Sequence, residues 1–203
     1  KGTSQLAAGY VIYGPQTAMV LTLGAGTHIF TLNPDTGEFC LTAAHLSIPE
    51  DTHEFAINTS NFRRWDGHVK AYIDDCFEGA EGPHGKNYNT RWIASLVAEC
   101  HRIMVRGGIF LYPADRREAY HSGRLRLAYE CNPIAFLVEQ AGGEATTGDQ
   151  RILDIEPTDI HQRAPLIFGS KNEVNLLIHY YKEVHPAQER SQLFGNRGLF
   201  RAG

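Results

Sequence analysis

The sequence lacks a long hydrophobic run, a basic excess and a secretory leader. No apolar stretch approaches the roughly 20 residues that a membrane-spanning helix requires, so we expect no such helix. The 19 Lys and Arg residues are outnumbered by 23 Asp and Glu, and this balance argues against a general nucleic-acid binder. No basic segment followed by an apolar segment opens the chain, so no signal peptide is visible and we expect a cytoplasmic protein.

Several familiar chemical motifs are missing as well. The four cysteines show no Cys-x-x-Cys spacing, which favours reduced thiols over a disulfide framework or a zinc site. The ten histidines are scattered, without a His-x-x-x-His pair, and no Gly-x-Gly-x-x-Gly motif occurs. We also find no Ser-His-Asp or Cys-His set. These absences leave no sign of nucleophilic triad chemistry or of dinucleotide binding.

What is present suits a globular protein with one large core or two smaller ones, because 42% of the 203 residues are hydrophobic and 21% are charged. Residues 1–46 predict an antiparallel meander. Its strands are expected at 10–13, 18–23, 28–32 and 39–42, separated by Gly, Pro, Asn and Asp turn residues. Four strands alone have little to pack against, and the chain begins with Lys rather than Met. We therefore expect preceding residues that complete a larger sheet.

Residues 47–185 change to alternating helices and strands, which predicts an α/β domain. Helices are expected over 61–77, from residue 90 to about 106, from Asn132-Pro133 to Gly142, and from the Ser170 capping box to about 184. Strands are expected at 55–57, 109–112, 124–129 and 166–168. Residues 186–203 are predicted to form a polar tail.

The most informative segment is the strand expected at 124–129, which ends in Glu130 just before the helix expected at Asn132. In α/β folds, ligands bind at such edges, and a helix amino terminus favours anions. A carboxylate there could hold a hard cation such as Mg²⁺, although a solvated turn carboxylate would look the same. Arg124 and Arg126 share a strand face, which suits a phosphate dianion or an edge protected by charge.

Three further residues are candidates with simpler explanations beside them. Tyr112 ends a strand, and its hydroxyl could donate a hydrogen bond to a ligand, or its ring could serve only in packing. Arg91 is expected at the start of the helix near residue 90, where a cation gains nothing from the helix dipole and so hints at another use. Asn58 follows the strand at 55–57 and could simply be a turn residue. The residues alone therefore predict an α/β domain with an anion-binding edge.

A family resemblance appears at these same residues. Tyr129-Glu130-Cys131-Asn132-Pro133-Ile134-Ala135-Phe136, followed by Glu139-Gln140-Ala141-Gly142-Gly143, resembles the signature of class I fructose-1,6-bisphosphatases. The segments at 5–10, 95–102, 107–113 and 160–163 are also similar to that family, in order and over nearly the whole chain. The resemblance implies a layered α-β-α sugar-phosphatase fold: residues 1–46 complete the sheet of the first domain, and 47–185 form a mixed-sheet, sugar-phosphate-binding domain.

The resemblance implies hydrolysis of the 1-phosphate of fructose 1,6-bisphosphate with Mg²⁺ or Mn²⁺. By position, it implies the following roles: Glu130 as a catalytic and metal-binding carboxylate; Asn58, Tyr112 and Arg124 as ligands of the 6-phosphate; Trp92 in a place usually held by Tyr; Arg91 reaching a neighbouring site in a homo-oligomer, dimer or tetramer; and Leu96 lining the sugar pocket.

Three departures bear on specificity. Trp92 can donate but not accept a hydrogen bond, Arg124 stands where Lys is common, and Asn61 stands where many relatives place a phosphate-contacting Tyr. These changes could extend the substrate range to sedoheptulose 1,7-bisphosphate. The family's remaining metal ligands are expected upstream of Lys1, so we expect this chain alone to be inactive. A non-catalytic sugar-phosphate-binding module remains an alternative, whereas inositol-monophosphatase-like activity is disfavoured by the 6-phosphate set.

Overall fold

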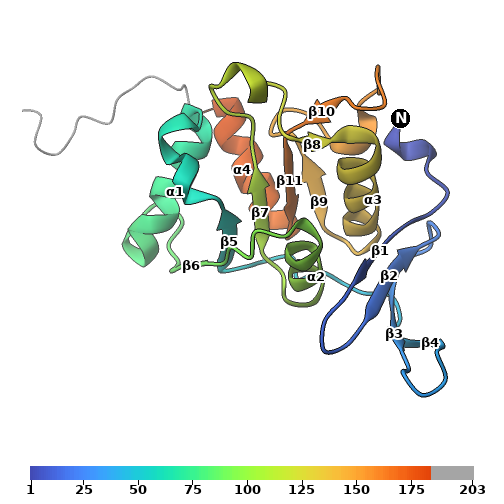
Figure 1. Cartoon of the computed structure of the whole chain (residues 1–203). Helices are drawn as coiled ribbons and strands as arrows, with labels where there is room; N and C mark the ends of the chain where they lie inside the picture. The colour runs from blue at the N-terminus through green and yellow to red at the C-terminus, as the bar shows by residue number, and fades with distance from the viewer. Residues whose placement is uncertain (184–203) are drawn as a thin grey trace, which may run out of the picture.

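The computed structural model describes residues 1–183, and the tail predicted at 186–203 lies outside them. Four strands open the chain: β1 (Ala8–Ile12), β2 (Ala18–Thr22), β3 (Thr27–Leu32) and β4 (Phe39–Ala43). They form an antiparallel sheet in the order β1-β2-β3-β4, which confirms the predicted meander. In Figure 1 this sheet extends from one side of the larger domain.

The larger domain is built on a five-stranded sheet in the order β6-β5-β7-β11-β9. Its strands are β5 (Glu54–Ile57), β6 (Asn89–Thr90), β7 (Ile109–Tyr112), β9 (Glu144–Thr146) and β11 (Leu166–Gly169). β5 runs parallel to β6 and β7, whereas β11 is antiparallel to β7 and β9, so the sheet is mixed, as expected. A separate two-stranded pair joins β8 (Leu125–Arg126) to β10 (Arg163–Ala164).

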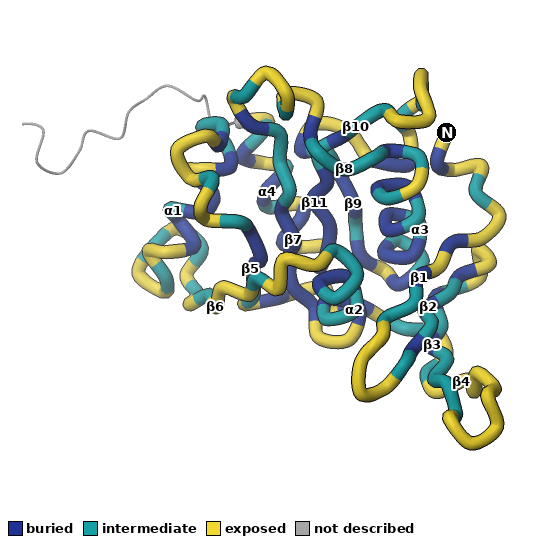
Figure 2. The backbone as a smooth tube through the Cα atoms, viewed as in Figure 1, coloured by how far each residue is buried: buried dark blue, intermediate teal, exposed yellow. Residues whose placement is uncertain are grey.

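Helices cover both faces of the sheet because its buried residues alternate in direction. Phe110 and Phe168 share a core with α2 (Leu96–Arg106), α3 (Asn132–Gln140) and the inner face of the meander. The other core lies beneath α1 (Gly67–Glu78) and α4 (Lys171–Glu183), and its strand residues are Phe55, Ile57, Ile109, Leu111 and Ile167. The buried segments in Figure 2 follow these two cores, and the result is the expected α-β-α layering.

The predicted helix over 61–77 begins too early. Residues Thr59–Arg64 form a 3-10 turn, and α1 begins at Gly67 after Asp66, whose side chain accepts a hydrogen bond from the Val69 N–H at 2.9 Å. The helix expected from residue 90 likewise begins only at Leu96, capped by Ser95. Residues Asn89–Thr90 instead pair with β5 and form the strand β6. A segment of two residues is too short for this pairing to be predicted from the sequence.

The predicted strand over 124–129 is also too long. β8 ends at Arg126, and a π-helical turn (Leu127–Cys131) runs directly into α3. Asn132 therefore lies inside the helical segment and is not its cap. Leu127 is fully buried, and Glu130 reaches back to accept the Arg126 N–H at 2.7 Å, so this carboxylate closes the start of the π-helical turn.

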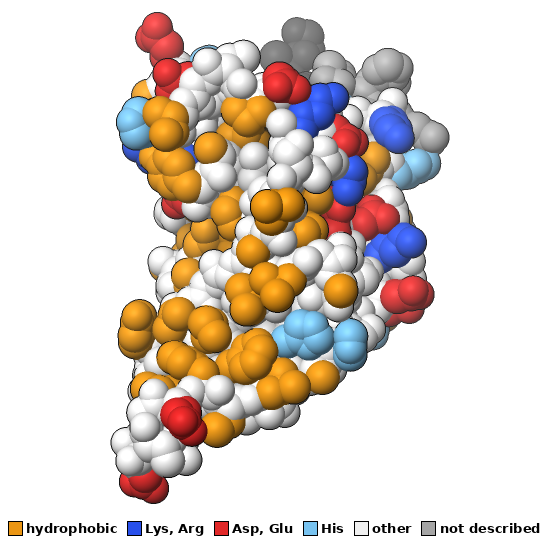
Figure 3. All heavy atoms as spheres, turned by 90° about the vertical axis from the view of Figure 1, so that its right-hand side faces the viewer, with side chains coloured by type: hydrophobic (Ala, Val, Ile, Leu, Met, Phe, Trp, Pro, Cys, Tyr) orange, Lys and Arg blue, Asp and Glu red, His pale blue; other side chains and the backbone are white. Residues whose placement is uncertain are grey.

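The meander is apolar on both faces. One cross-strand row, Tyr10–Val20–Ile29, is buried against α2 and α3, whereas the opposite row, Val11–Met19–Phe30–Leu41, is only partly covered. Figure 3 shows hydrophobic side chains gathered over much of this side of the molecule. A sheet that is apolar on two faces is typical of a sheet covered on both, so the outer row is suited to a further layer.

The predicted state of the cysteines is confirmed: all four are free. Burial raises the pKa of the Cys76, Cys100 and Cys131 thiols to about 12, so these side chains serve as packing groups. Within residues 1–183, no helix is long and apolar enough to cross a membrane.

Candidate functional site: an anion-binding pocket

The pocket forms where two parallel strands end. β5 and β7 are paired so that Ile57 lies beside Leu111, and this register brings Asn58 next to Tyr112 at the carboxyl edge of the sheet. Loops after both strands, together with the segment before β8, line a small depression that is open to solvent. Its lining residues are Ile57, Asn58, Asn61, Trp65, Leu111, Tyr112, Pro113, Asp115 and Arg124.

The positive charge of the pocket is arranged around one buried carboxylate. Asp115 is 6% exposed and accepts hydrogen bonds from Arg117 Nε at 3.0 Å and from Arg124 Nη2 at 3.4 Å. The Arg124 guanidinium also lies 3.8 Å from the centre of the Tyr120 ring. Two guanidinium groups against one carboxylate leave a single net positive charge at the pocket, which suits a bound anion.

This cluster makes stability depend on pH. Hydrogen bonding from Arg117 lowers the pKa of the Asp115 carboxyl to about 2, below the unfolded value near 4. The stabilisation is therefore present above about pH 4 and is lost as the pH falls towards 2. Asp115→Asn should flatten the acid limb of a plot of unfolding free energy against pH, measured by urea denaturation.

The matched control for this experiment is Asp35→Asn, which alters an exposed carboxylate in the turn between β3 and β4. It should leave the acid limb unchanged. Equal slopes for wild type and Asp115→Asn below pH 4 would contradict the role assigned to Asp115.

Two asparagines line the pocket, and the side-chain oxygen of each is bonded within the protein. The Asn58 oxygen accepts the Ser60 N–H at 3.1 Å, and the Asn61 oxygen accepts Arg117 Nη2 at 3.1 Å. Among the described residues neither Nδ2 group has a partner, so the free groups of both side chains are donors. With Tyr112 and Arg124, they make a pocket whose polar lining can donate to an anion from several directions.

Trp92 supports the pocket from behind. Its ring stacks on Tyr112 with centroids 6.2 Å apart and an interplanar angle of 8°, and on Phe110 at 5.9 Å and 9°. The structure thus joins Trp92 to the pocket through the tyrosine ring, and Trp92 itself is not a lining residue.

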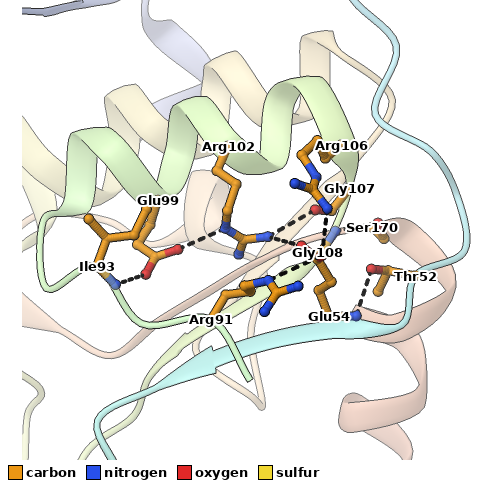
Figure 4. Close-up of polar contacts among 10 residues, drawn as sticks. All are labelled: Thr52, Glu54, Arg91, Ile93, Glu99, Arg102, Arg106, Gly107, Gly108 and Ser170. Carbon is orange, nitrogen blue, oxygen red and sulfur yellow. Dashed lines mark hydrogen bonds and ion pairs between the residues drawn. The ribbon is translucent and has the colours of Figure 1, made fainter. Parts of the chain in front are cut away.

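Arg91 lies elsewhere, in a network centred on Glu54 (Figure 4). Glu54 accepts from Arg91 Nε at 3.3 Å, Arg102 Nη1 at 2.7 Å and Arg106 Nη2 at 2.9 Å. The expectation that Arg91 stands at a helix start is wrong, because Arg91 follows β6 and α2 begins only at Leu96. Its side chain is 44% exposed, so it can still reach outward.

The loop between β6 and α2 is fixed at a second point. Glu99, fully buried on α2, accepts the Ile93 N–H at 2.6 Å and Arg102 Nε at 3.2 Å (Figure 4). These bonds hold the segment that carries both Arg91 and Trp92. Leu96, the first residue of α2, packs at the edge of the core and does not line the pocket.

Glu130 is separate from the pocket lining and stands in the π-helical turn. One carboxylate oxygen accepts the Arg126 N–H, which leaves the other for a ligand. A half-buried carboxylate fits the oxygen ligands that Mg²⁺ prefers. Within residues 1–183, however, no group of three His, Cys, Asp or Glu side chains could hold a metal, so the described chain contributes at most part of such a centre.

The fold and the pocket define an α/β protein with a donor-lined anion site at the carboxyl edge of its sheet. Comparison with known families is more specific: residues 48–182 match the model described as fructose-1-6-bisphosphatase, C-terminal domain, and residues 1–44 match the corresponding N-terminal domain. The chain belongs to the class 1 fructose-1,6-bisphosphatase family.

Relatives agree over nearly the whole chain. The class 1 fructose-1,6-bisphosphatase of Rhizobium meliloti is 57% identical over 201 residues, which are 99% of this chain and 58% of that protein. A class 1 enzyme of Nitrobacter hamburgensis is 59% identical, over 98% of this chain and 58% of its own length. The solved holo form of Leishmania major fructose-1,6-bisphosphatase has a TM-score of 0.85 at 42% identity, covering 90% of this chain and 54% of that one. The chain thus spans a little over half the length of these relatives.

The structure brings together three of the predicted residues, Asn58, Tyr112 and Arg124, and places Arg91, Leu96 and Glu130 outside their pocket. Sequence reasoning missed Asp115 and Arg117, which lie between the strands predicted at 109–112 and 124–129. The available signal was the charge pattern Asp115-Arg116-Arg117 soon after Pro113, at the end of a buried strand. The predicted common face of Arg124 and Arg126 was not informative, because β8 is only two residues long.

Proposed function

We propose that the complete protein hydrolyses the 1-phosphate of fructose 1,6-bisphosphate and that this chain supplies the pocket for the 6-phosphate. The observation that carries the proposal is the convergence of Asn58, Tyr112 and Arg124, with Asn61, in one donor-lined pocket of net positive charge. Family membership supports the same reaction. Such a role places the protein in carbohydrate metabolism, with gluconeogenesis or the Calvin cycle as the proposed pathway and the cytoplasm as the proposed location.

The proposed cofactor is Mg²⁺ or Mn²⁺, with Glu130 as this chain's ligand. When bound, such an ion polarises the phosphoryl group and activates water. Glu130 is pre-oriented by its bond to the Arg126 N–H, so its free oxygen is fixed in place before the metal arrives. The described residues contain no group of three side chains that could hold a metal, so the other ligands are proposed to come from the remaining part of the first domain. That part would also cover the outer row of the meander.

The test is phosphate release from fructose 1,6-bisphosphate, followed with and without Mg²⁺ and after chelation by EDTA. We expect the complete protein to be active only with the metal and the separate 203-residue chain to show no turnover. Activity of the complete protein that persists in EDTA would contradict the metal role. Absence of hydrolysis together with retained binding of fructose 6-phosphate would favour the alternative of a non-catalytic sugar-phosphate-binding module.

The substrate range follows from the same pocket. Asn61 lines the pocket with an amide in place of a hydroxyl, and Trp92 stacks on Tyr112 behind it; these two departures support sedoheptulose 1,7-bisphosphate as a second substrate. A homo-oligomer, dimer or tetramer, is proposed on the exposure of Arg91, whose guanidinium is anchored by Glu54 yet reaches solvent and could enter a neighbouring site. A monomer in analytical ultracentrifugation would contradict this assembly.

A further inference from the structure

The carboxylate and amide oxygens that line the pocket are hydrogen-bonded within the protein. The oxygens of Asn58 and Asn61 are occupied by protein donors, and the Asp115 oxygens are occupied by Arg117 and Arg124. The groups left free are two amide nitrogens, the Arg124 guanidinium and the Tyr112 hydroxyl, and all of them can donate. A phosphate monoester carries three acceptor oxygens, so its chemistry is complementary to a lining in which every carboxylate and amide oxygen is already bonded.

The orientation of Asn61 depends on one partner. An asparagine amide can rotate by 180° with almost no change of shape, which exchanges its donor and its acceptor. Arg117 Nη2 lies 3.1 Å from the Asn61 oxygen and has only hydrogens to offer. The reversed amide would set donor against donor, so Arg117 selects the orientation that leaves Nδ2 free for the pocket.

Arg117 is itself held in place. Asp115 accepts from its Nε at 3.0 Å and from its backbone N–H at 3.0 Å, and the guanidinium lies 4.5 Å from the centre of the Tyr120 ring. A guanidinium bonded on one edge and stacked on one face has little freedom left. The cost of ordering this side chain is therefore met in the folded protein before any ligand binds.

We propose that Arg117, anchored by Asp115, is a positioning residue that fixes Asn61 as a phosphate donor. The inference rests on the proposed function, because it takes the 6-phosphate pocket as its site. The rival reading is that Arg117 contacts the phosphate directly. The two readings differ in one respect: a positioning residue acts only while Asn61 is present.

A double-mutant cycle in the complete protein separates them. Arg117→Met alone and Asn61→Ala alone should each raise the KM for fructose 1,6-bisphosphate about 10-fold, as expected for loss of a hydrogen bond to a charged group, with kcat changed less than about 3-fold. In the Asn61→Ala background, Arg117→Met should add no more than about 2-fold. An additive cycle would overturn the positioning role and favour direct contact.

Three further variants guard against effects of folding and of charge. Asn61→Asp keeps the shape and the bond to Arg117 but turns an anionic oxygen towards the ligand, so KM should rise at least about 10-fold while the melting temperature is maintained. An unchanged KM would overturn the donor role of Asn61. Arg116→Met removes the same charge from an exposed neighbour and should leave KM unchanged. If Arg117→Met proves unstable, Arg117→Lys keeps a cation near Asp115 yet should show the same rise in KM.

Binding of fructose 6-phosphate, measured by calorimetry on the same proteins, keeps the two proposals distinguishable. If the wild type binds this ligand but does not hydrolyse the bisphosphate, the proposed function fails and the cycle is evaluated from the dissociation constants. If the wild type is active and the cycle is additive, only the positioning role fails. If the wild type does not bind fructose 6-phosphate, both are overturned.

Discussion

Replacing Glu130 by glutamine should reduce kcat of the complete protein about 100-fold and raise the Mg²⁺ concentration needed for half-maximal activity. Glutamine keeps the size of the side chain and an oxygen that can still accept the Arg126 N–H, so the π-helical turn should survive. What is lost is the negative charge, which a hard dication requires from its ligand. Steady-state rates measured over a Mg²⁺ titration check the result.

Glu156→Gln is the matched control, because it removes the same charge from an exposed position farther along the chain. It should leave both kcat and the Mg²⁺ dependence unaltered. Normal Mg²⁺ dependence in Glu130→Gln would remove Glu130 from the metal centre. Its position outside the pocket lining agrees with a division of labour in which this carboxylate serves the reacting phosphate and the pocket holds the remote one.

Local sequence was a good guide where the chain follows a simple period. The strand Ile109–Tyr112 was predicted with correct bounds, because it is a short apolar run between Gly107-Gly108 and Pro113. The four strands of the meander were also placed to within a few residues, since Gly and Pro turns mark their ends. In each case the decisive residues are neighbours in the sequence.

Prediction failed where distant contacts decide. Asn89–Thr90 forms a strand only because β5 offers an edge more than 30 residues away, and this pairing displaces the start of α2 to Leu96. The strand ending before Glu130 was overestimated because nothing local marks the π-helical turn, which is closed by that residue's own side chain. Residue propensities describe neither the pairing with a distant strand nor the side-chain bond that closes the π-helical turn.

The pocket shows the same limit. Asn58, Tyr112 and Arg124 could be grouped in advance only through the family resemblance, and their shared pocket is now seen directly. Hydrogen bonds link Asp115 to Arg117 and Arg117 to Asn61. Asp115 and Arg117 lie 54 and 56 positions after Asn61 in the sequence, so no local pattern reveals these contacts. It becomes visible only when hydrogen-bond donors and acceptors are followed atom by atom.

Replacing Arg124 by alanine should raise the KM for fructose 1,6-bisphosphate about 100-fold while kcat changes less than about 3-fold. The guanidinium lies at the pocket proposed for the non-reacting phosphate, so its contribution should be the same in the ground state and in the transition state. Asp115 keeps its closer partner, Arg117, in this variant, so the loss of Arg124 does not leave a buried carboxylate unpaired. Steady-state kinetics over a wide range of substrate concentrations measure the two constants separately.

Arg124→Lys separates charge from geometry in the same assay. Lysine retains the positive charge but loses the planar contact with the Tyr120 ring, where the guanidinium now lies 3.8 Å from the ring centre. We expect a rise in KM of only about 3- to 10-fold, because most of the attraction to a phosphate dianion is retained. An unchanged KM in Arg124→Ala would remove this arginine from the pocket's function. A fall in kcat equal to the fall in kcat/KM would instead mean that Arg124 acts on the transition state, and that the reacting phosphate is the one bound here.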